Sequence, residues 1–489
     1  MNLTIEAIAR MLGAGASSVS GGPVTGVTTD SRAAQPGDCF FAIAGEHFDG
    51  HQYVGQAFDR GAACAVVSHG PEEPPRPKRP ILRVEDTVKA LGDLARAYRS
   101  MNSFKVVAIT GSVGKTTTRQ IVYHVLSRHF QARQARKNFN NTIGLPLTLL
   151  EAQPDDEVIV AELGANSLGE IGYLTGIARP NVAVVTNVYP AHLEGFGSLD
   201  TIIQEKTAIA DSLADGGLFI VNGDIDALVS ACRQDGRSFQ TFGKSAACDF
   251  RAERIDLQSL TSTFTIDGQR VHVPLPGPGN VENALAAWVV CRQFGLKIND
   301  FARALRNLPG VSMRAEPLQI GALTVLNDCY NANPASMANA LATLGNIRSA
   351  AQDRRPRRLV FVCGHMAELG ARAGSLHADL GRQVAQAGVD LLLTVGPVTE
   401  VTAETARQAA THQLQTAHFD DNISLCGRLR RLLREDDIVL VKGSRTARLE
   451  SVVEKLHELF PQAASPRPIQ AIPAPRTRRP ERIGDREQG

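Results

Sequence analysis

Short apolar runs alternate along the chain with longer amphipathic segments. Each apolar run is five or six residues long and rich in Val and Ile, as expected of strands buried on both faces of a sheet. The runs cover residues 105–110, 158–162, 182–187, 218–222, 359–364, 391–396 and 438–442. The segments between them have the length of helices, as at residues 116–130, where Ile121, Val122, Val125 and Leu126 fall on one face. The pattern predicts an α/β fold with largely parallel sheets, whose ligands bind at the carboxyl ends of strands.

Two changes in composition divide the chain. Residues 70–83 contain five prolines and are expected to form a surface connection that leads into a helical segment at residues 84–100. After Leu308-Pro309-Gly310 we expect a new strand at residues 318–327 and a second α/β series. A chain of 489 residues also exceeds the ~250–300 residues at which a single core stops growing. We therefore expect three domains, followed by a disordered Arg/Pro tail. The domains cover residues 1–83, 84–309 and 310–461, and the tail covers residues 462–489.

Composition excludes several classes of protein. Hydrophobic residues make up 43% of the chain and charged residues 21%, as in globular proteins. No apolar run approaches the ~20 residues that span a bilayer, and no signal peptide is recognised, so a cytoplasmic protein is expected. Eight cysteines without a C-x-x-C pair indicate neither zinc nor disulfides. The net charge of the chain is +2, and the tail alone carries +3 from six arginines and three acidic residues. The rest of the chain therefore has a net charge of −1, which argues against nucleic-acid binding.

The most specific motif is a phosphate-binding loop that follows the apolar run at residues 105–110. It consists of Gly111, Ser112, Val113, Gly114, Lys115, Thr116 and Thr117. The glycines let backbone N–H groups turn toward phosphate oxygens, and the start of the next helix favours an anion. We expect Lys115 to neutralise the β- and γ-phosphates and the hydroxyl of Thr116 to bind Mg²⁺. Because Ile109 stands where the usual pattern begins with glycine, the alternative is an ordinary βα turn with an incidental lysine.

Four further sequence blocks follow this loop in order. They are residues 140–146 (NNTIGLP), 162–166 with 169–171 (ELGAN and GEI), 191–197 (AHLEGFG) and 328–334 (DCYNANP). Residues 29–32 (TDSR), 367–370 (AELG) and 441–445 (VKGSR) extend the pattern. Together with the loop, these blocks resemble the Mur ligases over residues 25–455. The resemblance implies a first domain that binds a UDP substrate, a central P-loop ATPase-like domain and a Rossmann-like third domain.

Within that family, the blocks DCYNANP and AHLEGFG favour the branch that adds a dipeptide. The resemblance implies an ATP-dependent ligase that joins D-alanyl-D-alanine to UDP-N-acetylmuramoyl-tripeptide through an acyl phosphate, in peptidoglycan synthesis. ATP and Mg²⁺ would be its cofactors, its substrates would be small molecules, and we expect a monomer. The alternatives are a related ligase that adds one amino acid to a muramoyl peptide or glutamate to folate, and a nucleotide-binding scaffold without activity.

The resemblance also assigns roles to residues at strand ends and on one helix. Glu162 ends a strand beside the loop, and His192 follows another strand, so both can reach Lys115. Lys206 matches a lysine that these enzymes carbamylate with CO2, which would convert a cation into a metal ligand. The expected catalytic residues are Lys115, His192 and Lys206, and the expected Mg²⁺ ligands are Thr116, Glu162, His192 and Lys206. Taken singly, Glu162 also fits a surface charge, His192 a loop residue and Lys206 an exposed helix lysine.

Five residues are expected to bind the nucleotide by resemblance. Asn283, Asp328, Tyr330 and Asn331 would contact adenine and ribose, because an aromatic ring and amides suit a purine. Core packing is the alternative for Tyr330. Arg314 begins the third domain and would neutralise phosphate when that domain closes.

Four further residues have less specific expected roles. Lys442 and Arg445 suit either phosphate binding or a solvated strand end. In the first domain, Ser31 and Arg32 are candidates for binding the uridine diphosphate of the substrate, since a guanidinium matches phosphate oxygens.

Two positions depart from the family pattern. Gly279 stands where a histidine is usual, and His365 stands where an aspartate is usual. The loss of those side chains would alter contacts with nucleotide or substrate. Because the pattern persists in every domain, we still expect activity.

Overall fold

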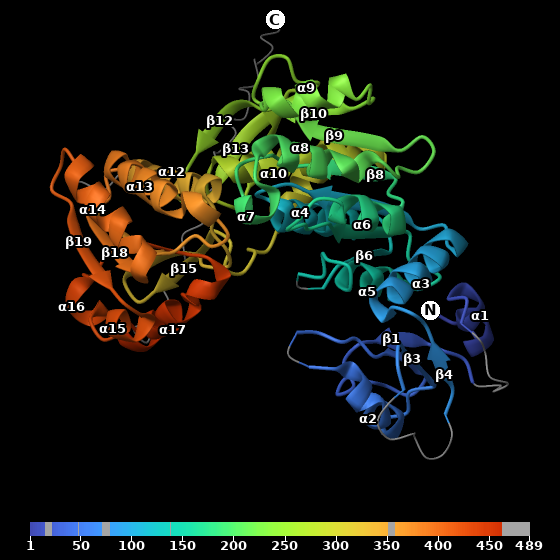
Figure 1. The fold of residues 1–489 in the computed structure, drawn as a ribbon. Coiled ribbons are helices and arrows are strands. Elements are labelled where there is room, and N and C mark those ends of the chain that lie inside the picture. Colours follow the sequence, from blue (N-terminus) through green and yellow to red (C-terminus); the bar gives the residue numbers. More distant parts are fainter. Residues whose placement is uncertain (15–21, 47, 71–78, 137, 351–356, 462–489) are drawn as a thin grey trace, which may run out of the picture.

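The computed structural model describes residues 1–14, 22–46, 48–70, 79–136, 138–350 and 357–461. The predicted tail at residues 462–489, and residues 71–78 of the proline-rich connection, lie outside these ranges. Within them, the strands form four sheets in three α/β units (Figure 1). The three larger sheets are wholly or mainly parallel, which confirms the predicted fold class.

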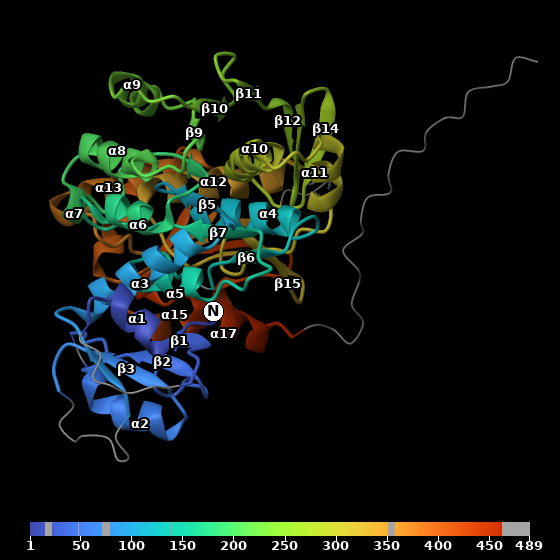
Figure 2. The same ribbon diagram turned by 90° about the vertical axis from the view of Figure 1, so that its right-hand side faces the viewer.

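The first unit is a four-stranded parallel sheet of order β1-β2-β3-β4. Its elements are α1 (Ile5–Met11), β1 (Gly26–Thr28), β2 (Asp38–Phe41), η1 (Gly50–Tyr53), α2 (Val54–Asp59), β3 (Cys64–Val67) and β4 (Ile81–Arg83). Phe40, Ala57 and Val67 form a small separate core between this sheet and α2. In both views the unit lies at one end of the molecule, beside α3 (Thr87–Met101) and α5 (Gly144–Leu150) (Figure 1, Figure 2).

The central unit contains a seven-stranded parallel sheet of order β11-β10-β9-β8-β5-β7-β6. Its strands are β5 (Lys105–Thr110), β6 (Ala132–Gln134), β7 (Val158–Glu162), β8 (Val182–Val185), β9 (Leu218–Asn222), β10 (Gln240–Gly243) and β11 (Phe250–Arg251). Its other helices are α4 (Lys115–Leu126), α6 (Glu170–Ala178), α7 (Leu193–Phe196), α8 (Leu199–Thr207), η2 (Ala208–Ala210), α9 (Asp226–Gln234), α10 (Pro278–Gln293) and α11 (Ile298–Leu305). The strand order reverses at β5, and α/β sheets bind ligands at the carboxyl end of such a strand.

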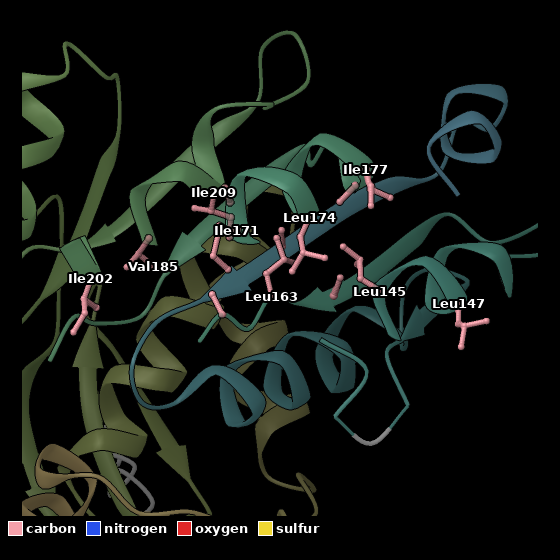
Figure 3. Packing of buried hydrophobic residues seen from close by; sticks show 14 of the residues in the cluster. Leu145, Leu147, Leu163, Ile171, Leu174, Ile177, Val185, Ile202 and Ile209 are labelled. Carbon is pink, nitrogen blue, oxygen red and sulfur yellow. The ribbon is translucent and has the colours of Figure 1, made fainter. Parts of the chain in front are cut away.

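Apolar side chains at helical spacing fix α6 on this sheet. Ile171, Leu174 and Ile177 fall on one face of the helix and are fully buried. They meet Leu163, which directly follows β7, and Ile209 of η2 (Figure 3). Each buried side chain of this size stabilises the fold by about 1.5–3 kcal/mol. This packing holds the carboxyl ends of β7 and β8 in fixed positions.

The third unit contains a six-stranded sheet of order β15-β16-β20-β17-β18-β19. Its strands are β15 (Glu316–Ile320), β16 (Leu323–Asp328), β17 (Leu359–Gly364), β18 (Leu391–Val395), β19 (Gln415–Phe419) and β20 (Ile438–Lys442). Its helices are α12 (Pro334–Ala350), η3 (Gly370–Arg372), α13 (Ala373–Gln386), η4 (Pro397–Thr399), α14 (Glu400–Ala409), α15 (Asn422–Cys426), α16 (Leu429–Leu432), η5 (Arg445–Ala447) and α17 (Glu450–Leu459). Only β15 is antiparallel to its neighbour among the described strands of this sheet.

Three sequence expectations differ from the structure. The single strand expected at residues 318–327 is a hairpin, because the chain reverses between Ile320 and Leu323. The helix expected at residues 116–130 ends at Leu126, and the following N–H groups form tighter turns. An antiparallel sheet of β12 (Glu253–Leu257), β13 (Ser262–Ile266) and β14 (Gln269–Val273) was not predicted.

The described residues bear on two expectations from composition. All eight cysteines are free thiols, and six of them are buried. No helix in the described part of the chain is both long enough and apolar enough to cross a membrane.

Candidate active site

A cleft of about 450 Å³ lies where the central unit meets the third unit. The central unit contributes the phosphate loop, Glu162, His192 and Asn283. The third unit contributes six predicted residues on the opposite side. These are Arg314, Asp328, Tyr330, Asn331, Lys442 and Arg445. Residues predicted from three separate parts of the chain are therefore brought to one site.

The phosphate loop joins the end of β5 to the start of α4. Its backbone is held from the side by the segment after β8: the N–H of Val113 donates to Oδ1 of Asn187 at 2.8 Å, and the hydroxyl of Ser112 donates to the carbonyl of Tyr189 at 2.9 Å. Nζ of Lys115 donates to the carbonyl of Gly111 at 2.7 Å. Gly111 itself does not line the cleft, whereas residues 112–117 all do. The loop is thus preformed, with its lysine folded back over it.

Replacing Gly114 with alanine should weaken nucleotide binding. The φ of Gly114 is +85°, and a Cβ atom there would lie 2.2 Å from Oδ1 of Asn283. Strain of about 1–3 kcal/mol at this position should raise the dissociation constant for ADP about tenfold or more. Isothermal titration calorimetry measures the change. The control is Gly236→Ala, since Gly236 also has positive φ but has open space around it; equal affinities in both variants would contradict the prediction.

Glu162 is a buried carboxylate that faces the start of α4. Oε2 accepts from the hydroxyl of Thr116 at 2.8 Å, and Oε1 accepts from Nδ2 of Asn140 at 3.0 Å. Burial alone would raise the pKa of this carboxyl, but Lys115, with Arg314 and other donors, outweighs it and holds the pKa below its usual value. Adjacent oxygens around octahedral Mg²⁺ lie about 2.9 Å apart. The two oxygens of Thr116 and Glu162 therefore fit neighbouring positions on one Mg²⁺ ion.

His192 lies at the edge of the cleft, directly before α7. Its backbone is left-handed, with φ +53°, and its ring contacts the carboxylate of Glu368 from the third unit through Nδ1. Burial lowers the pKa of the imidazole, although Glu368 opposes this effect. A neutral ring is the form that binds metal ions.

Lys206 lies close to the cleft but does not line it. Its side chain is 3% exposed, and Nζ stands 5.3 Å from the centre of the Phe196 ring. This ammonium donates no hydrogen bond among the described residues. Burial, reinforced by the nearby charge of Lys115, lowers the pKa of Lys206 to about 7. The carboxylates of Glu205 and Glu170 act on the ammonium through their charge and raise its pKa, but burial outweighs them. The alternative of an exposed helix lysine is therefore wrong, and a large share of this amine is neutral near pH 7.

Lys442 is buried and paired, so the alternative of a solvated strand end is wrong for it. Nζ donates to Oδ2 of Asp328 at 2.7 Å and to the carbonyl of Asn331 at 2.9 Å. Lys442 thereby anchors the loop that carries Tyr330. The Tyr330 ring lines the cleft instead of the core, and the guanidinium of Arg314 lies 4.1 Å from its centre. Arg445 also lines the cleft but is exposed and paired with Glu450.

Replacing Lys442 with methionine should destabilise the third unit. The change leaves the half-buried carboxylate of Asp328 without its cation, which should lower the free energy of unfolding by about 3 kcal/mol. Urea denaturation measures this loss. The control is Lys455→Met, which removes an exposed pair with Glu458 and should cost under about 1 kcal/mol. Equal losses in the two variants would show that the buried pair has no special role.

Ser31 and Arg32 do not reach the cleft. The hydroxyl of Ser31 donates to Oε1 of Gln56 at 2.6 Å, and the guanidinium of Arg32 donates twice to Asp30 at 2.9 Å. The Arg32 side chain is 78% exposed. Both residues belong to the first unit, where a bound substrate could reach them only from outside the cleft.

Asn339 is a cleft residue that the sequence reasoning missed. Its Oδ1 accepts the backbone N–H of Gly279 at 3.1 Å, across the junction of the two units. A Cβ atom at Gly279 would lie 2.9 Å from the Asn339 amide, so the departure from histidine makes room for this contact. At the second departure, Nε2 of His365 pairs at 2.8 Å with the hydroxyl of Thr446, which lines the cleft, whereas His365 itself does not.

Arg119 was also missed, although it lies one turn after Thr116 on the buried face of α4. Nε of its guanidinium stands 3.6 Å from Oε2 of Glu162. Burial lowers the pKa of Arg119, and Glu162 opposes this effect. A polar residue on an otherwise apolar helix face was the only available signal in the sequence.

Comparisons with known proteins agree with this geometry. Three family models match the chain. The model of the Mur ligase family catalytic domain matches residues 23–99, and the model of the Mur ligase middle domain matches residues 109–291. The model of the Mur ligase glutamate ligase domain matches residues 313–445. The UDP-N-acetylmuramoyl-tripeptide–D-alanyl-D-alanine ligase of Escherichia coli is 37% identical, over 88% of this chain and 93% of that protein. The enzyme of the same name from Bacillus subtilis is 32% identical, over 89% and 93%.

Solved structures are similar over the same length. A crystal structure of MurF from Acinetobacter baumannii has a TM-score of 0.82 and 30% identity, and covers 94% of this chain and 99% of that one. A MurF ligase from Thermotoga maritima in complex with ADP has a TM-score of 0.77 and 27% identity, and covers 89% and 98%. The resemblance inferred from the sequence blocks and the three-domain architecture are both confirmed: the chain belongs to the Mur ligase family.

Proposed function

We propose that this chain joins D-alanyl-D-alanine to UDP-N-acetylmuramoyl-tripeptide and converts ATP to ADP and phosphate. The observation that carries the proposal is the cleft, in which a phosphate loop and a buried carboxylate face an arginine and a tyrosine from the third unit. Relatives that share more than 30% identity over most of the chain have that activity in their names. The other ligases of this architecture and the inactive scaffold are therefore not favoured.

ATP is required because a carboxylate is a poor electrophile. An oxygen of the tripeptide's terminal carboxylate attacks the γ-phosphorus and the bond to the β-phosphate oxygen breaks, which gives an acyl phosphate and ADP. The dipeptide's amine then attacks the acyl carbon, loses a proton and expels phosphate. Lys115 and Arg314 supply positive charge from opposite sides of the cleft, where charge develops in both steps.

The oxygen-rich side of the cleft is proposed to hold Mg²⁺. Thr116 and Glu162 present the adjacent oxygens, and His192 and a carbamylated Lys206 complete the set. When bound, Mg²⁺ neutralises phosphate charge and polarises phosphoryl oxygens. Carbamylation requires the neutral amine: Nζ attacks the carbon of CO2, a proton leaves the nitrogen, and the product is an anion. Burial of Lys206 favours this reaction because it disfavours the ammonium form.

The nucleotide is proposed to lie across the junction of the two units. Asn283 is beside the phosphate loop, whereas Asp328, Tyr330 and Asn331 face it from the third unit. Gly111 does not line the cleft, so its proposed role is to shape the backbone of the loop. In the first unit, Ser31 and the exposed guanidinium of Arg32 are proposed to bind the uridine diphosphate. Arg32 would then divide its hydrogen bonds between Asp30 and the diphosphate, or break those with Asp30.

We also propose domain limits and a setting for the enzyme. The four sheets are consistent with domains at residues 1–83, 84–309 and 310–461. A cytoplasmic monomer that binds neither nucleic acid nor membrane would meet its soluble, nucleotide-linked substrates directly.

An acceptor comparison tests the function. Purified protein is supplied with Mg²⁺, ATP and UDP-N-acetylmuramoyl-tripeptide, and ADP release is measured with D-alanyl-D-alanine, with single L-amino acids and with glutamate. Release should be at least about tenfold faster with the dipeptide, and mass spectrometry should detect the pentapeptide product. ADP release that is equal with every acceptor, or absent with all of them, would reject the proposal.

A further inference from the structure

Glu368 joins the third unit to the start of α7 through two separate atoms. Its carboxylate contacts Nδ1 of the His192 ring. Its backbone carbonyl accepts the N–H of Glu194, in the first turn of α7, at 3.3 Å. The start of α7 is therefore fixed by one residue from the loop after β17.

Both partners of the ring contact have an unusual backbone. The φ angle is +53° at His192 and +60° at Glu368, in the left-handed region that non-glycine residues rarely adopt. Each such residue costs about 1–3 kcal/mol and persists only where surrounding structure enforces it. Both residues also line the cleft. The contact therefore belongs to the wall of the cleft, where the Glu368 side chain is 52% exposed.

The chemistry of the pair determines where the ring carries its hydrogen. An ionised carboxylate can only accept a hydrogen bond, so Nδ1 of a neutral His192 must be the donor. Nε2 is then left with a lone pair, which is the form that binds a metal ion. Without this acceptor, the ring can exchange the two tautomers and rotate. Because Glu368 belongs to the third unit, the choice is made only when the two units meet.

We propose that Glu368 is a positioning residue, which holds His192 in the Nδ1–H tautomer and so makes Nε2 available to Mg²⁺ when the third unit closes on the central unit. The inference rests on the proposed function, because it takes His192 as a Mg²⁺ ligand. Glu368 itself need not touch nucleotide, metal or substrate.

The tautomer can be read directly by nuclear magnetic resonance. In protein labelled with ¹⁵N at histidine, long-range ¹H–¹⁵N spectra distinguish the two ring nitrogens, and loss of a signal in His192→Gln assigns the ring. Wild-type protein should show the hydrogen on Nδ1. Glu368→Gln should keep it there, because the amide oxygen still accepts, whereas Glu368→Ala should show a mixture. A wild-type ring with its hydrogen on Nε2, or an unchanged tautomer in Glu368→Ala, would overturn the proposal.

Metal affinity provides a second measurement. Titration with Mn²⁺ in the presence of ADP should give a dissociation constant about 10–100-fold weaker in Glu368→Ala and only a few-fold weaker in Glu368→Gln. The matched control is Glu194→Gln, which removes a carboxylate from α7 without touching the ring, and it should behave as wild type. Loss of thermal stability in Glu368→Ala with unchanged Mn²⁺ affinity would show a merely structural contact. Inactivity of wild-type protein with every acceptor would instead reject the proposed ligase reaction. The tautomer would still be measured independently, because its measurement requires no turnover.

Discussion

Replacement of Lys115 by alanine is expected to lower the rate of dipeptide addition by at least about 10³-fold. Lys115 begins α4 and lies in the cleft, where its ammonium now bonds the carbonyl of Gly111. An arriving phosphate can replace that carbonyl as the partner, and the positive charge then counters the charge that develops during transfer. In the variant, kcat should fall by a larger factor than KM rises, because this interaction strengthens in the transition state.

Steady-state release of ADP measures the effect of Lys115→Ala. The matched control is Lys105→Ala, since Lys105 is an exposed lysine at the opposite end of the same strand. Its rate should stay within about twofold of wild type, because it lies far from the phosphate loop. A Lys115→Ala protein that keeps more than about a tenth of the wild-type rate would contradict the mechanism.

Replacement of Lys206 by methionine is expected to lower the rate of dipeptide addition by more than ~100-fold. Loss of an outer partner of a metal site typically lowers activity by only ~10–100-fold. Methionine keeps the length of the side chain but cannot form a carbamate. In wild-type protein, the pKa of about 7 means that the neutral share of Lys206 rises from about a tenth at pH 6 to about nine tenths at pH 8. Carbamate formation, and the activity that depends on it, should therefore be lost as the pH falls through 7.

Carbon-13 nuclear magnetic resonance with labelled bicarbonate detects the carbamate directly. Its signal should appear in wild-type protein at pH 8, weaken at pH 6 and be absent from Lys206→Met. The control is Lys89→Met, because the Lys89 side chain is 71% exposed on α3 and pairs with Asp93. A Lys206→Met protein with normal activity, or wild-type protein that responds to neither bicarbonate nor pH, would exclude the carbamate.

Seven strands of the two large sheets could be predicted closely from the sequence, whereas β6, β10, β11 and β19 were not predicted. The expected bounds of β5, β7 and β20 match the structure at both ends, because a strand buried on both faces is a continuous apolar run. The hairpin of β15 and β16 was missed, since its turn at Gly321 lies between apolar residues and contains no proline, asparagine or aspartate. The strands β12–β14 were missed because many of their side chains are exposed and polar.

The candidate site divides in a similar way. The phosphate loop and Glu162 were accessible to sequence reasoning because each adjoins a strand end, where local order fixes position in the sheet. The partners of His192 and Lys442 were not, since Glu368 and Asp328 lie more than 100 residues away in the chain. The first contact depends on how two units meet, and the second depends on which strands pair within the third sheet. No local pattern encodes either.

The position of the cleft between two units leads us to expect a limit on the speed of the enzyme. A nucleotide bound as proposed, between the phosphate loop and the side chains of Arg314 and Tyr330, would leave when the units separate. That separation moves a whole unit through water and is slowed by solvent friction. Bond formation at phosphorus is not slowed in this way. At saturating substrate, turnover would then slow in proportion to solvent viscosity, even though no chemical group had changed.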